Sequence, residues 1–237
     1  MTRVALDRAL SKLGLASRAQ ARRLILDGRV RVNGHVVHRP TTAIMLERAK
    51  ISIDGAAASS DAPDRRILLF HKPRGTVTTR RDPEGRRTVF DVLGDASRGL
   101  VAVGRLDVAS TGLLIFTNDT QLANRLTDPA ERVPRRYVVT VRGRVTPETA
   151  RQLEKGLVAP ASGSGGRAER LSASHVEIRK ASNRETHLIV ELVEGRNREL
   201  RRLFTAVGHE PTRIHRISFG EYELGDLQSG QWREMTE

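Results

Sequence analysis

The N-terminal part of the chain carries a pattern that few folds accommodate, because two short helices are followed at once by a tight hairpin. Four apolar side chains recur at the spacing of one helix face, and a glycine follows them: Leu6, Ala9, Leu10, Leu13 and Gly14. This spacing predicts an amphipathic helix, and the glycine is placed to end it in a left-handed conformation.

A second helix is predicted directly after this glycine. Ser17 and Gln20 stand three residues apart, the spacing of a capping box. Ala21, Leu24 and Ile25 supply the apolar stripe, and Asp27-Gly28 ends the helix. Basic side chains of this helix are left for its outer surface.

The hairpin follows without a gap. The segments 29–32 and 35–37 alternate between apolar and polar residues, and Asn33-Gly34 joins them. An Asn-Gly pair suits a type I′ turn, which requires two consecutive residues with positive φ. The order of helix, helix and hairpin, with its caps and basic positions, resembles the RNA-binding module named after ribosomal protein S4.

This resemblance spans about residues 4–55 and implies an S4-like RNA-binding domain over 1–55. It assigns the docking of RNA to five basic side chains: Arg18, Arg22, Arg23, Arg29 and Arg31. The competing interpretation is that these arginines are only the solvated face of a helix.

Charge supports a polyanionic partner for this domain. The chain holds 41 Lys+Arg and 28 Asp+Glu among 237 residues, a formal net charge of +13, and residues 1–55 alone carry +7. Of the basic residues 36 are Arg, whose planar fork of donors suits phosphate. From composition alone, codon bias explains the excess of arginine as well as binding of a polyanion does. The positions of the arginines therefore have to distinguish the two explanations.

Composition excludes several other classes. The absence of cysteine rules out disulfide scaffolds and thiolate metal sites. Aromatic residues make up 3% of the chain, too few for a serial base-stacking groove. The longest apolar runs, such as 67–70 and 113–116, are four residues long, far short of a membrane span. We expect a monomeric cytoplasmic protein with no metal site.

Residues 56–65 are small or polar and lack periodicity, which predicts a linker before a second domain over 66–237. Strands are predicted at 67–72, 100–103, 113–117, 136–142, 176–179 and 187–193, and helices at 120–126, 147–155 and 199–207. Because helices occur only irregularly between these strands, we predict an α+β domain with a mainly antiparallel sheet. Residues 159–166, rich in Ser and Gly, are expected to form a surface loop.

The most informative stretch of this domain is 101–116, in which Asp107 stands in a glycine-bounded loop between two apolar strands. Loops held by rigid strands often carry catalytic residues. A lone aspartate in a loop more often accepts hydrogen bonds from nearby backbone N–H groups. The residues around Asp107 therefore have to distinguish a catalytic role from a structural one. Downstream, 194–204 combines a glycine turn with four arginines that could hold RNA phosphates or pair with Asp107.

Five segments together identify a family resemblance. They are HKPRG at 71–75, AVGRLDVASTGLLIFTND at 102–119, RRYVV at 135–139, EGRNRELRRLF at 194–204 and RIHRISFG at 213–220. In this order, behind the N-terminal module, they resemble the RsuA/RluB/RluE/RluF group of ribosomal RNA pseudouridine synthases. The segment TRRDPEGRRTVFD at 79–91 is most similar to the RluB branch, which modifies large-subunit ribosomal RNA.

The resemblance implies a cofactor-free isomerisation of uridine in ribosomal RNA, in which the base is flipped out of its stack. Asp107 matches the essential aspartate, which attacks C1′ or removes the 2′ proton, two routes that stay open. Tyr137 matches the tyrosine that packs on the base, and Arg201 the basic partner of the aspartate.

The resemblance also implies contacts to substrate from residues around this catalytic set of Asp107, Tyr137 and Arg201. Arg105 matches the arginine that fills the space left by the flipped base, Leu200 lies beside the base, and Lys72 belongs to the motif that supports the catalytic loop. With Arg196 and Arg198 of the arginine-rich turn, these residues form the candidate substrate-binding set.

Two other classes compete with this interpretation. A non-catalytic ribosome-assembly factor would use Asp107 only to brace its loop. An RNA methyltransferase requires a glycine-rich cofactor loop after a strand, and the chain has no G-x-G-x-x-G segment.

Overall fold

The computed structural model describes residues 3–46, 48–57, 65–159 and 168–235. The chain divides into two compact units: Met1–Arg66 together with Thr117–Arg125, and Ile67–Phe116 together with Leu126–Glu237. The described secondary structure of the first unit comprises β1 (Arg3–Ala5), α1 (Leu6–Lys12), α2 (Arg18–Leu26), β2 (Val30–Val32), β3 (His35–Val36), β4 (Ala43–Met45), β5 (Ile51–Ile53) and β6 (Ala56–Ala57).

The two predicted N-terminal helices are present. Gly14 follows α1 with φ +76°, as its capping role requires. Ser17 and Gln20 form the predicted capping box at the start of α2. One expectation is wrong: Leu13 is 36% exposed, because α1 ends at Lys12 and the side chain lies beyond the buried stripe. The core of the unit consists of Leu6, Ala9, Leu10, Ala21, Ile25, Val30 and Ile44.

The predicted hairpin is also confirmed. Asn33 and Gly34 have φ values of 52° and 85°, the positive pair that a type I′ turn needs. The hairpin is part of a sheet ordered β3-β2-β5-β6, and β1 pairs separately with β4. The expected linker from residue 56 needs correction, because Ala56 and Ala57 form β6 and pair with β5. The rest of that predicted linker, up to residue 64, lies outside the described residues.

The first unit also includes a segment from the middle of the chain. The Thr120 hydroxyl donates to the Ser11 carbonyl at 2.8 Å, and Arg65 pairs with Asp119 at 3.2 Å. Residues near the expected domain boundary and residues of the catalytic half are thus joined in one compact unit.

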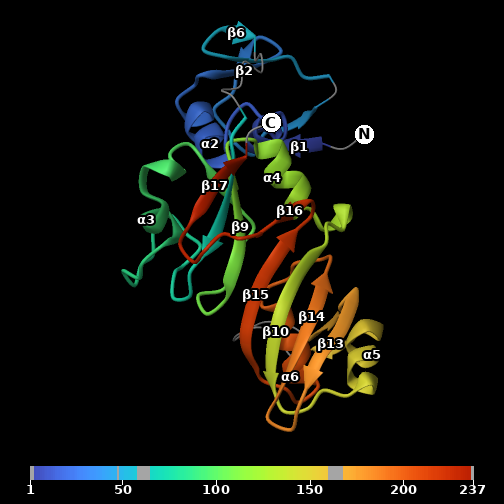
Figure 1. The fold of residues 1–237 in the computed structure, drawn as a ribbon. Helices are drawn as coiled ribbons and strands as arrows, with labels where there is room; N and C mark the ends of the chain where they lie inside the picture. The colour runs from blue at the N-terminus through green and yellow to red at the C-terminus, as the bar shows by residue number, and fades with distance from the viewer. Residues whose placement is uncertain (1–2, 47, 58–64, 160–167, 236–237) are drawn as a thin grey trace. The chain divides into compact units, whose positions relative to one another are not determined.

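The second unit is built on one large sheet (Figure 1). Its described strands are β7 (Ile67–Lys72), β8 (Val101–Val103), β9 (Thr111–Thr117), β10 (Arg135–Arg142), β11 (Leu157–Ala159), β12 (Glu169–Leu171), β13 (His175–Ala181), β14 (Glu185–Leu192), β15 (Pro211–Phe219), β16 (Tyr222–Glu223) and β17 (Trp232–Met235). Its helices are α3 (Val89–Leu93), α5 (Pro147–Lys155) and α6 (Glu199–Ala206), with short 3-10 turns at Gly94–Ser97 and Pro129–Glu131. Helix α4 (Thr120–Thr127) follows β9.

The predicted α+β architecture with a mainly antiparallel sheet is confirmed. The strand order is β13-β14-β10-β15-β9-β7-β17, with β8 and β16 paired at its side. Antiparallel pairs join β10 to β14 and to β15, whereas β15 and β9 run parallel. Helix α5 packs beside β13, and α6 packs against β15 on the face of the sheet (Figure 1).

The parallel contact between β9 and β15 requires a glycine. Gly112 lies opposite Arg216 with φ +105°, and a Cβ at this position would meet the Arg216 carbonyl oxygen at 2.2 Å. Only a residue without a side chain allows the two strands to approach this closely. Because β9 follows the Asp107 loop and β15 carries Arg216, this contact places two distant segments side by side.

In the second unit, the sequence prediction omits β11, β12, β15, β16, β17 and α3, and several of its boundaries differ by one or two residues from those observed. Ala159 is the buried last residue of β11 and does not belong to the expected surface loop. The remainder of that loop prediction, 160–166, lies outside the described residues. Within the described parts of the chain, no helix is long and apolar enough to cross a bilayer.

Candidate active site

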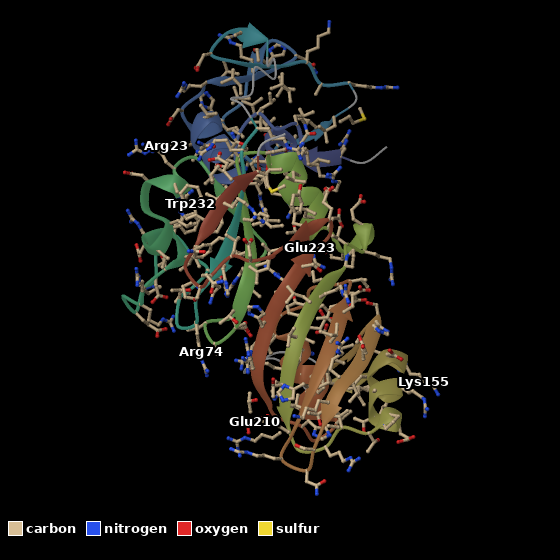
Figure 2. All side chains as sticks on the ribbon, viewed as in Figure 1. Arg23, Arg74, Lys155, Glu210, Glu223 and Trp232 are labelled. Atoms are coloured by element: carbon tan, nitrogen blue, oxygen red, sulfur yellow. The ribbon has the colours of Figure 1, made fainter. Side chains whose placement is uncertain are left out.

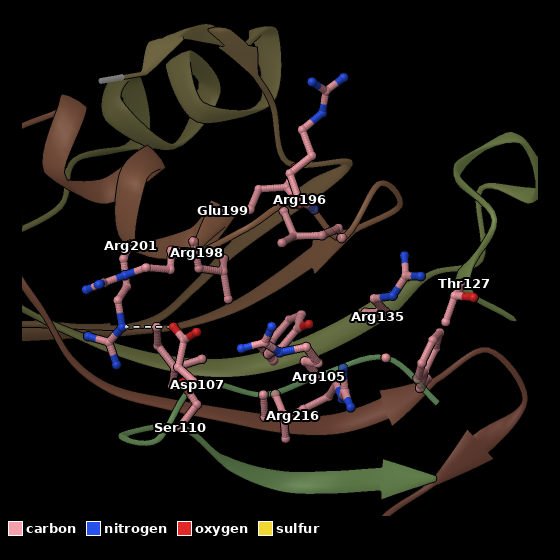
Figure 3. Close-up of a pocket in the computed structure, with 18 residues that line it drawn as sticks. Arg105, Asp107, Ser110, Thr127, Arg135, Arg196, Arg198, Glu199, Arg201 and Arg216 are labelled. Atoms are coloured by element: carbon pink, nitrogen blue, oxygen red, sulfur yellow. Dashed lines mark hydrogen bonds and ion pairs between the residues drawn. The ribbon is translucent and has the colours of Figure 1, made fainter. Parts of the chain in front are cut away.

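The predicted catalytic residues meet at a pocket of about 160 Å³ in the second unit. It is built from the loop between β8 and β9, the turn that leads into α6, and strands β10 and β15. Its lining includes seven of the eight residues predicted for catalysis or substrate contact: Asp107, Tyr137, Arg201, Arg105, Leu200, Arg196 and Arg198 (Figure 3).

Asp107 faces Arg201 across this pocket (Figure 3). Arg201 Nε lies 3.4 Å from Asp107 Oδ2, and the two side chains are 21% and 37% exposed. Arg201 stands in the first turns of α6, so a rigid helix holds the cation that faces the carboxylate. Partial exposure keeps the carboxylate within reach of a substrate.

The eighth residue, Lys72, does not line the pocket, so its placement in the substrate-binding set is corrected. It is fully buried behind the loop, where its ammonium donates to the carbonyls of Ser110 at 2.9 Å and Pro73 at 3.1 Å. Burial lowers the pKa of Lys72 to about 8, although the charge of Asp107 opposes this shift. The supporting position agrees with the implied role of its motif, bracing of the loop from behind.

The loop itself is further closed by its own backbone and by Thr78. Ser110 N–H donates to the Asp107 carbonyl at 2.9 Å, and the Thr78 hydroxyl donates to the Leu106 carbonyl at 2.9 Å. These bonds leave the Asp107 carboxylate free of a structural bond to the loop backbone among the described contacts. The observation favours a chemical role over the bracing role that sequence left open.

One wall of the pocket is formed by apolar and aromatic side chains. Tyr137 on β10 and Leu200 on α6 are 7% and 5% exposed, and Ile214 and Phe219 of β15 line the same space. An aromatic ring and apolar side chains offer a stacking surface to one heterocycle.

The arginines of the turn before α6 differ in their surroundings. Arg196 pairs with Glu169 at 2.5 Å and also with Glu194, so carboxylates already offset its charge. Arg198 is exposed, has a left-handed backbone with φ 49°, and begins the helix as its N-cap residue. Arg105, in the loop between β8 and β9, is exposed and also lines the pocket.

Two buried arginines in the wall were not assigned a role from sequence. Arg135 is 5% exposed and donates to the carbonyls of Val133 at 3.1 Å and Leu126 at 2.9 Å. Burial lowers its pKa. Arg216 is 2% exposed and donates from Nε to the Leu113 carbonyl at 2.7 Å. A sequence signal for these two residues was available. Each arginine lies in a predicted family segment, RRYVV or RIHRISFG, and takes a buried position of a strand.

Glu199 is the third residue that sequence reasoning missed. It is 4% exposed, lines the pocket, and accepts the backbone N–H of Arg196 at 2.9 Å through Oε2. Burial raises its pKa to about 7, and the nearby Glu194 carboxylate adds to this shift. A buried carboxyl in a pocket is a typical functional group, and only the fold brings it there.

The five arginines predicted to dock RNA are all exposed in the first unit. Arg18 and Arg22 lie 3.8 and 3.4 Å from the buried carboxylate of Asp7. Arg29 makes a bidentate pair with Asp54 at 2.8 and 2.6 Å. Partnered in this way, these guanidinium groups are held in place, and the carboxylates of Asp7 and Asp54 offset part of their charge locally.

The other two docking candidates make lighter contacts. Arg31 donates to the Gly34 carbonyl at 3.2 Å, inside its own hairpin. Arg23 lines a surface hollow of α2 together with Leu15, Gln20 and Leu24.

In the second unit, Arg74 stands exposed on the turn after β7, and Figure 2 shows its side chain pointing away from the ribbon.

Comparison with known proteins gives the class of the chain. The RNA pseudouridylate synthase model matches residues 66–206, and the S4 domain model matches residues 6–42. A crystal structure of a pseudouridylate synthase superposes with a TM-score of 0.66 and 25% identity, covering 98% of this chain and 96% of that one. The chain belongs to the RNA pseudouridylate synthase family, whose members are isomerases.

Named relatives extend over nearly the whole chain. An uncharacterized RNA pseudouridine synthase of Aquifex aeolicus is 34% identical over 238 residues, with 100% of this chain and 92% of that protein covered. Ribosomal large subunit pseudouridine synthase B of Escherichia coli is 39% identical over 236 residues, covering 97% and 78%. The enzyme of the same name from Pseudomonas aeruginosa is 39% identical over 239 residues, covering 98% of this chain and 59% of that protein. These comparisons confirm the family resemblance of the motifs.

Proposed function

We propose that the protein converts a specific uridine of large-subunit ribosomal RNA to pseudouridine, with Asp107 as its catalytic carboxylate. The observation that carries this proposal is the meeting of Asp107 and Arg201 in a pocket whose wall holds Tyr137. The names of the relatives from Escherichia coli and Pseudomonas aeruginosa support the choice of large-subunit RNA.

The reaction exchanges one bond of uracil for another. The bond from N1 to C1′ breaks, the base turns, and a bond from C5 to C1′ forms while the C5 proton leaves and N1 gains a proton. Asp107 acts on the sugar, either by attack at C1′ or by removal of the 2′ proton. Oxidation state does not change overall, so we propose that the reaction needs no cofactor. Among the described residues, no three His, Cys, Asp or Glu side chains gather as a metal-binding group.

The substrate must be flipped out of its helix to enter this pocket, because C1′ is shielded in a stacked strand. Extrusion costs roughly a few kcal/mol. Stacking on Tyr137 offsets part of this cost. We assign to Arg105, which also lines the pocket, the filling of the space that the base leaves. Leu200 packs beside the base.

Binding of the surrounding RNA is assigned to exposed cations. In the first unit these are Arg18, Arg22, Arg23, Arg29 and Arg31, and at the pocket Arg196 and Arg198 contact the strand next to the flipped base. We place the protein in the cytoplasm, where its ribosomal substrate is made, and expect it to act as a monomer.

The test is a pseudouridine map of ribosomal RNA. Ribosomal RNA from a strain that lacks the protein is incubated with purified protein, and new pseudouridines are located by a chemical stop in reverse transcription. One new position in the large-subunit RNA is the expected result. No new pseudouridine in either ribosomal RNA would show that this chain only binds RNA, and a position in the small-subunit RNA would overturn the choice of substrate.

A further inference from the structure

Two polar atoms in the wall of the pocket make no hydrogen bond within the described structure. They are Oε1 of Glu199 and Nη2 of Arg216, and both are shielded from solvent. Buried polar atoms in proteins are nearly always bonded, so each such atom requires an explanation. Both residues line the pocket that holds Asp107 and Tyr137 (Figure 3).

Each of these side chains is held in place by its other polar atom. Glu199 Oε2 accepts the backbone N–H of Arg196 at 2.9 Å, and Arg216 Nε donates to the Leu113 carbonyl at 2.7 Å. The Arg216 guanidinium also lies over the Phe219 ring, with its carbon 5.0 Å from the ring centroid. The unbonded atoms are therefore fixed in position before a substrate arrives, the condition for electrostatic preorganisation.

The protonation state of Glu199 decides whether Oε1 donates or accepts. Burial raises the pKa of Glu199 to about 7, with Glu194 adding to the shift and the backbone N–H groups and the charge of Arg196 opposing it. The other charged or titratable side chains of the pocket and of the strands packed against α6 are Arg105, Asp107, Arg135, Tyr137, Glu169, Arg170, Arg198, Arg201, Arg213, His215 and Arg216. In its protonated form the carboxyl carries an O–H group on Oε1, because Oε2 already accepts the Arg196 N–H.

Uracil offers two matching acceptors. When the bond from N1 to C1′ breaks, its electron pair goes to N1, and the negative charge is shared with the carbonyl oxygens O2 and O4. Hydrogen-bond donors aimed at these oxygens stabilise the charge as it develops. The charge disappears again when C5 bonds to C1′, the C5 proton leaves and N1 takes up a proton.

We propose that protonated Glu199 and Arg216 donate hydrogen bonds to the carbonyl oxygens of the flipped uracil and stabilise it as it leaves C1′. The inference rests on the proposed function, because it needs uridine in this pocket. An ionised Glu199 would instead present a lone pair to the negative base. The rate of the chemical step should therefore fall as pH rises above the range in which Glu199 keeps its proton.

The test compares two variants of Glu199 with a matched control. In Glu199→Gln, the amide oxygen keeps the bond to Arg196 N–H and the amide nitrogen donates at every pH. Glu199→Leu removes the donor. The control is Glu148→Leu in the first turn of α5, where the Glu148 side chain is 74% exposed. Single-turnover rates are measured with saturating enzyme on the large-subunit RNA between about pH 6 and pH 9, the range around a carboxyl pKa of about 7.

Wild type should lose activity by about tenfold per pH unit above the pKa of Glu199. Glu199→Gln should stay within about threefold of wild type at the acidic end and show no decline. Glu199→Leu should be slower by about 10²-fold at the acidic end, with RNA affinity unchanged, and Glu148→Leu should match wild type throughout.

Two results would overturn the inference: Glu199→Leu as fast as wild type, or Glu199→Gln with the same alkaline decline as wild type. If Glu199→Leu melts at a lower temperature because its turn is no longer braced, the pH profiles of wild type and Glu199→Gln still decide. A wild type that forms no pseudouridine in any ribosomal RNA would contradict the proposed function instead, before Glu199 is tested.

Discussion

The arginines of the two units differ in what surrounds them. In the N-terminal unit, the five docking candidates are exposed, and Arg18, Arg22 and Arg29 face carboxylates. In the pocket, Arg135 and Arg216 are almost fully buried and donate to backbone carbonyls. Exposed cations bind a polyanion through displaced counterions and tolerate substitution, whereas buried ones act through fixed geometry. The same residue type is therefore exposed to solvent in one unit and buried in the wall of the pocket in the other.

The largest effect should come from the pocket. Asp107→Asn keeps the size of the side chain but removes its charge, so we expect single-turnover isomerisation to fall by about 10⁴-fold or more. Affinity for the RNA should stay within about twofold, because phosphate contacts lie elsewhere. Asp95→Asn is the matched control, since its side chain is 94% exposed in the second unit. Rates of Asp107→Asn near those of wild type would refute the assignment of the catalytic carboxylate.

Removal of the Arg201 cation should have the next largest effect. Arg201→Leu leaves Asp107 without the cation that lies 3.4 Å from it, and we expect the single-turnover rate to fall by about 10- to 100-fold. Arg201→Lys should recover part of this rate, because a charge remains although the fork geometry is gone. The pair is measured by a double-mutant cycle with Asp107→Asn. Fully additive effects would show that Arg201 acts independently of Asp107.

Lys72 gives a prediction on stability and pH. Its folded pKa of about 8 lies below the ordinary value of 10.5, so the folded state binds its proton less tightly than the unfolded state. Unfolding free energy should therefore rise as pH increases from about 8 to 10.5, by about 3 kcal/mol at most. The free energy of unfolding is measured in urea for wild type and for Lys72→Met across this pH range. The difference between the two proteins isolates the contribution of Lys72, because all other groups titrate in both. A difference in unfolding free energy that stays constant with pH would contradict the lowered pKa of the buried Lys72 ammonium.

The smallest effect should come from the basic surface of the first unit. Replacing Arg18, Arg22 and Arg23 together by Gln should weaken RNA binding by about tenfold and lower the slope of log affinity against log salt by about one unit for each phosphate that the variant no longer neutralises. The single-turnover rate with saturating enzyme should not change. Filter binding at several salt concentrations measures the affinity and its salt slope. A change in the rate at saturation without a change in affinity would reverse the roles of the two regions.

Local signals carried most of the fold prediction. The capping box of Ser17 and Gln20 and the turn of Asn33-Gly34 depend on neighbours within three residues, and both are present. Helix α5 also has its predicted bounds, because Thr146 and Pro147 start it and Gly156 ends it. Elements defined by nearby residues could be predicted because their physical causes are themselves nearby in sequence.

The rest depends on contacts between distant segments. The role of Arg216 follows from its bond to Leu113, 103 residues away, and from the close approach of Gly112. The sequence does not reveal that Glu199 is buried, because it lies in a segment rich in arginine. Only the packing of α6 against the sheet removes its side chain from water. Sequence reasoning found the residues that resemblance names, but it could not show which charges are buried.

We propose that the pocket performs the reaction and that the first unit supplies affinity for RNA. One experiment tests both parts, in which single-turnover rate at saturation and RNA affinity are measured for Asp107→Asn and for the triple Arg18/Arg22/Arg23 variant. We predict that Asp107→Asn loses the rate and keeps the affinity, whereas the triple variant keeps the rate and binds RNA more weakly. If Asp107→Asn still forms pseudouridine at the wild-type rate, this division of roles between the two units is contradicted.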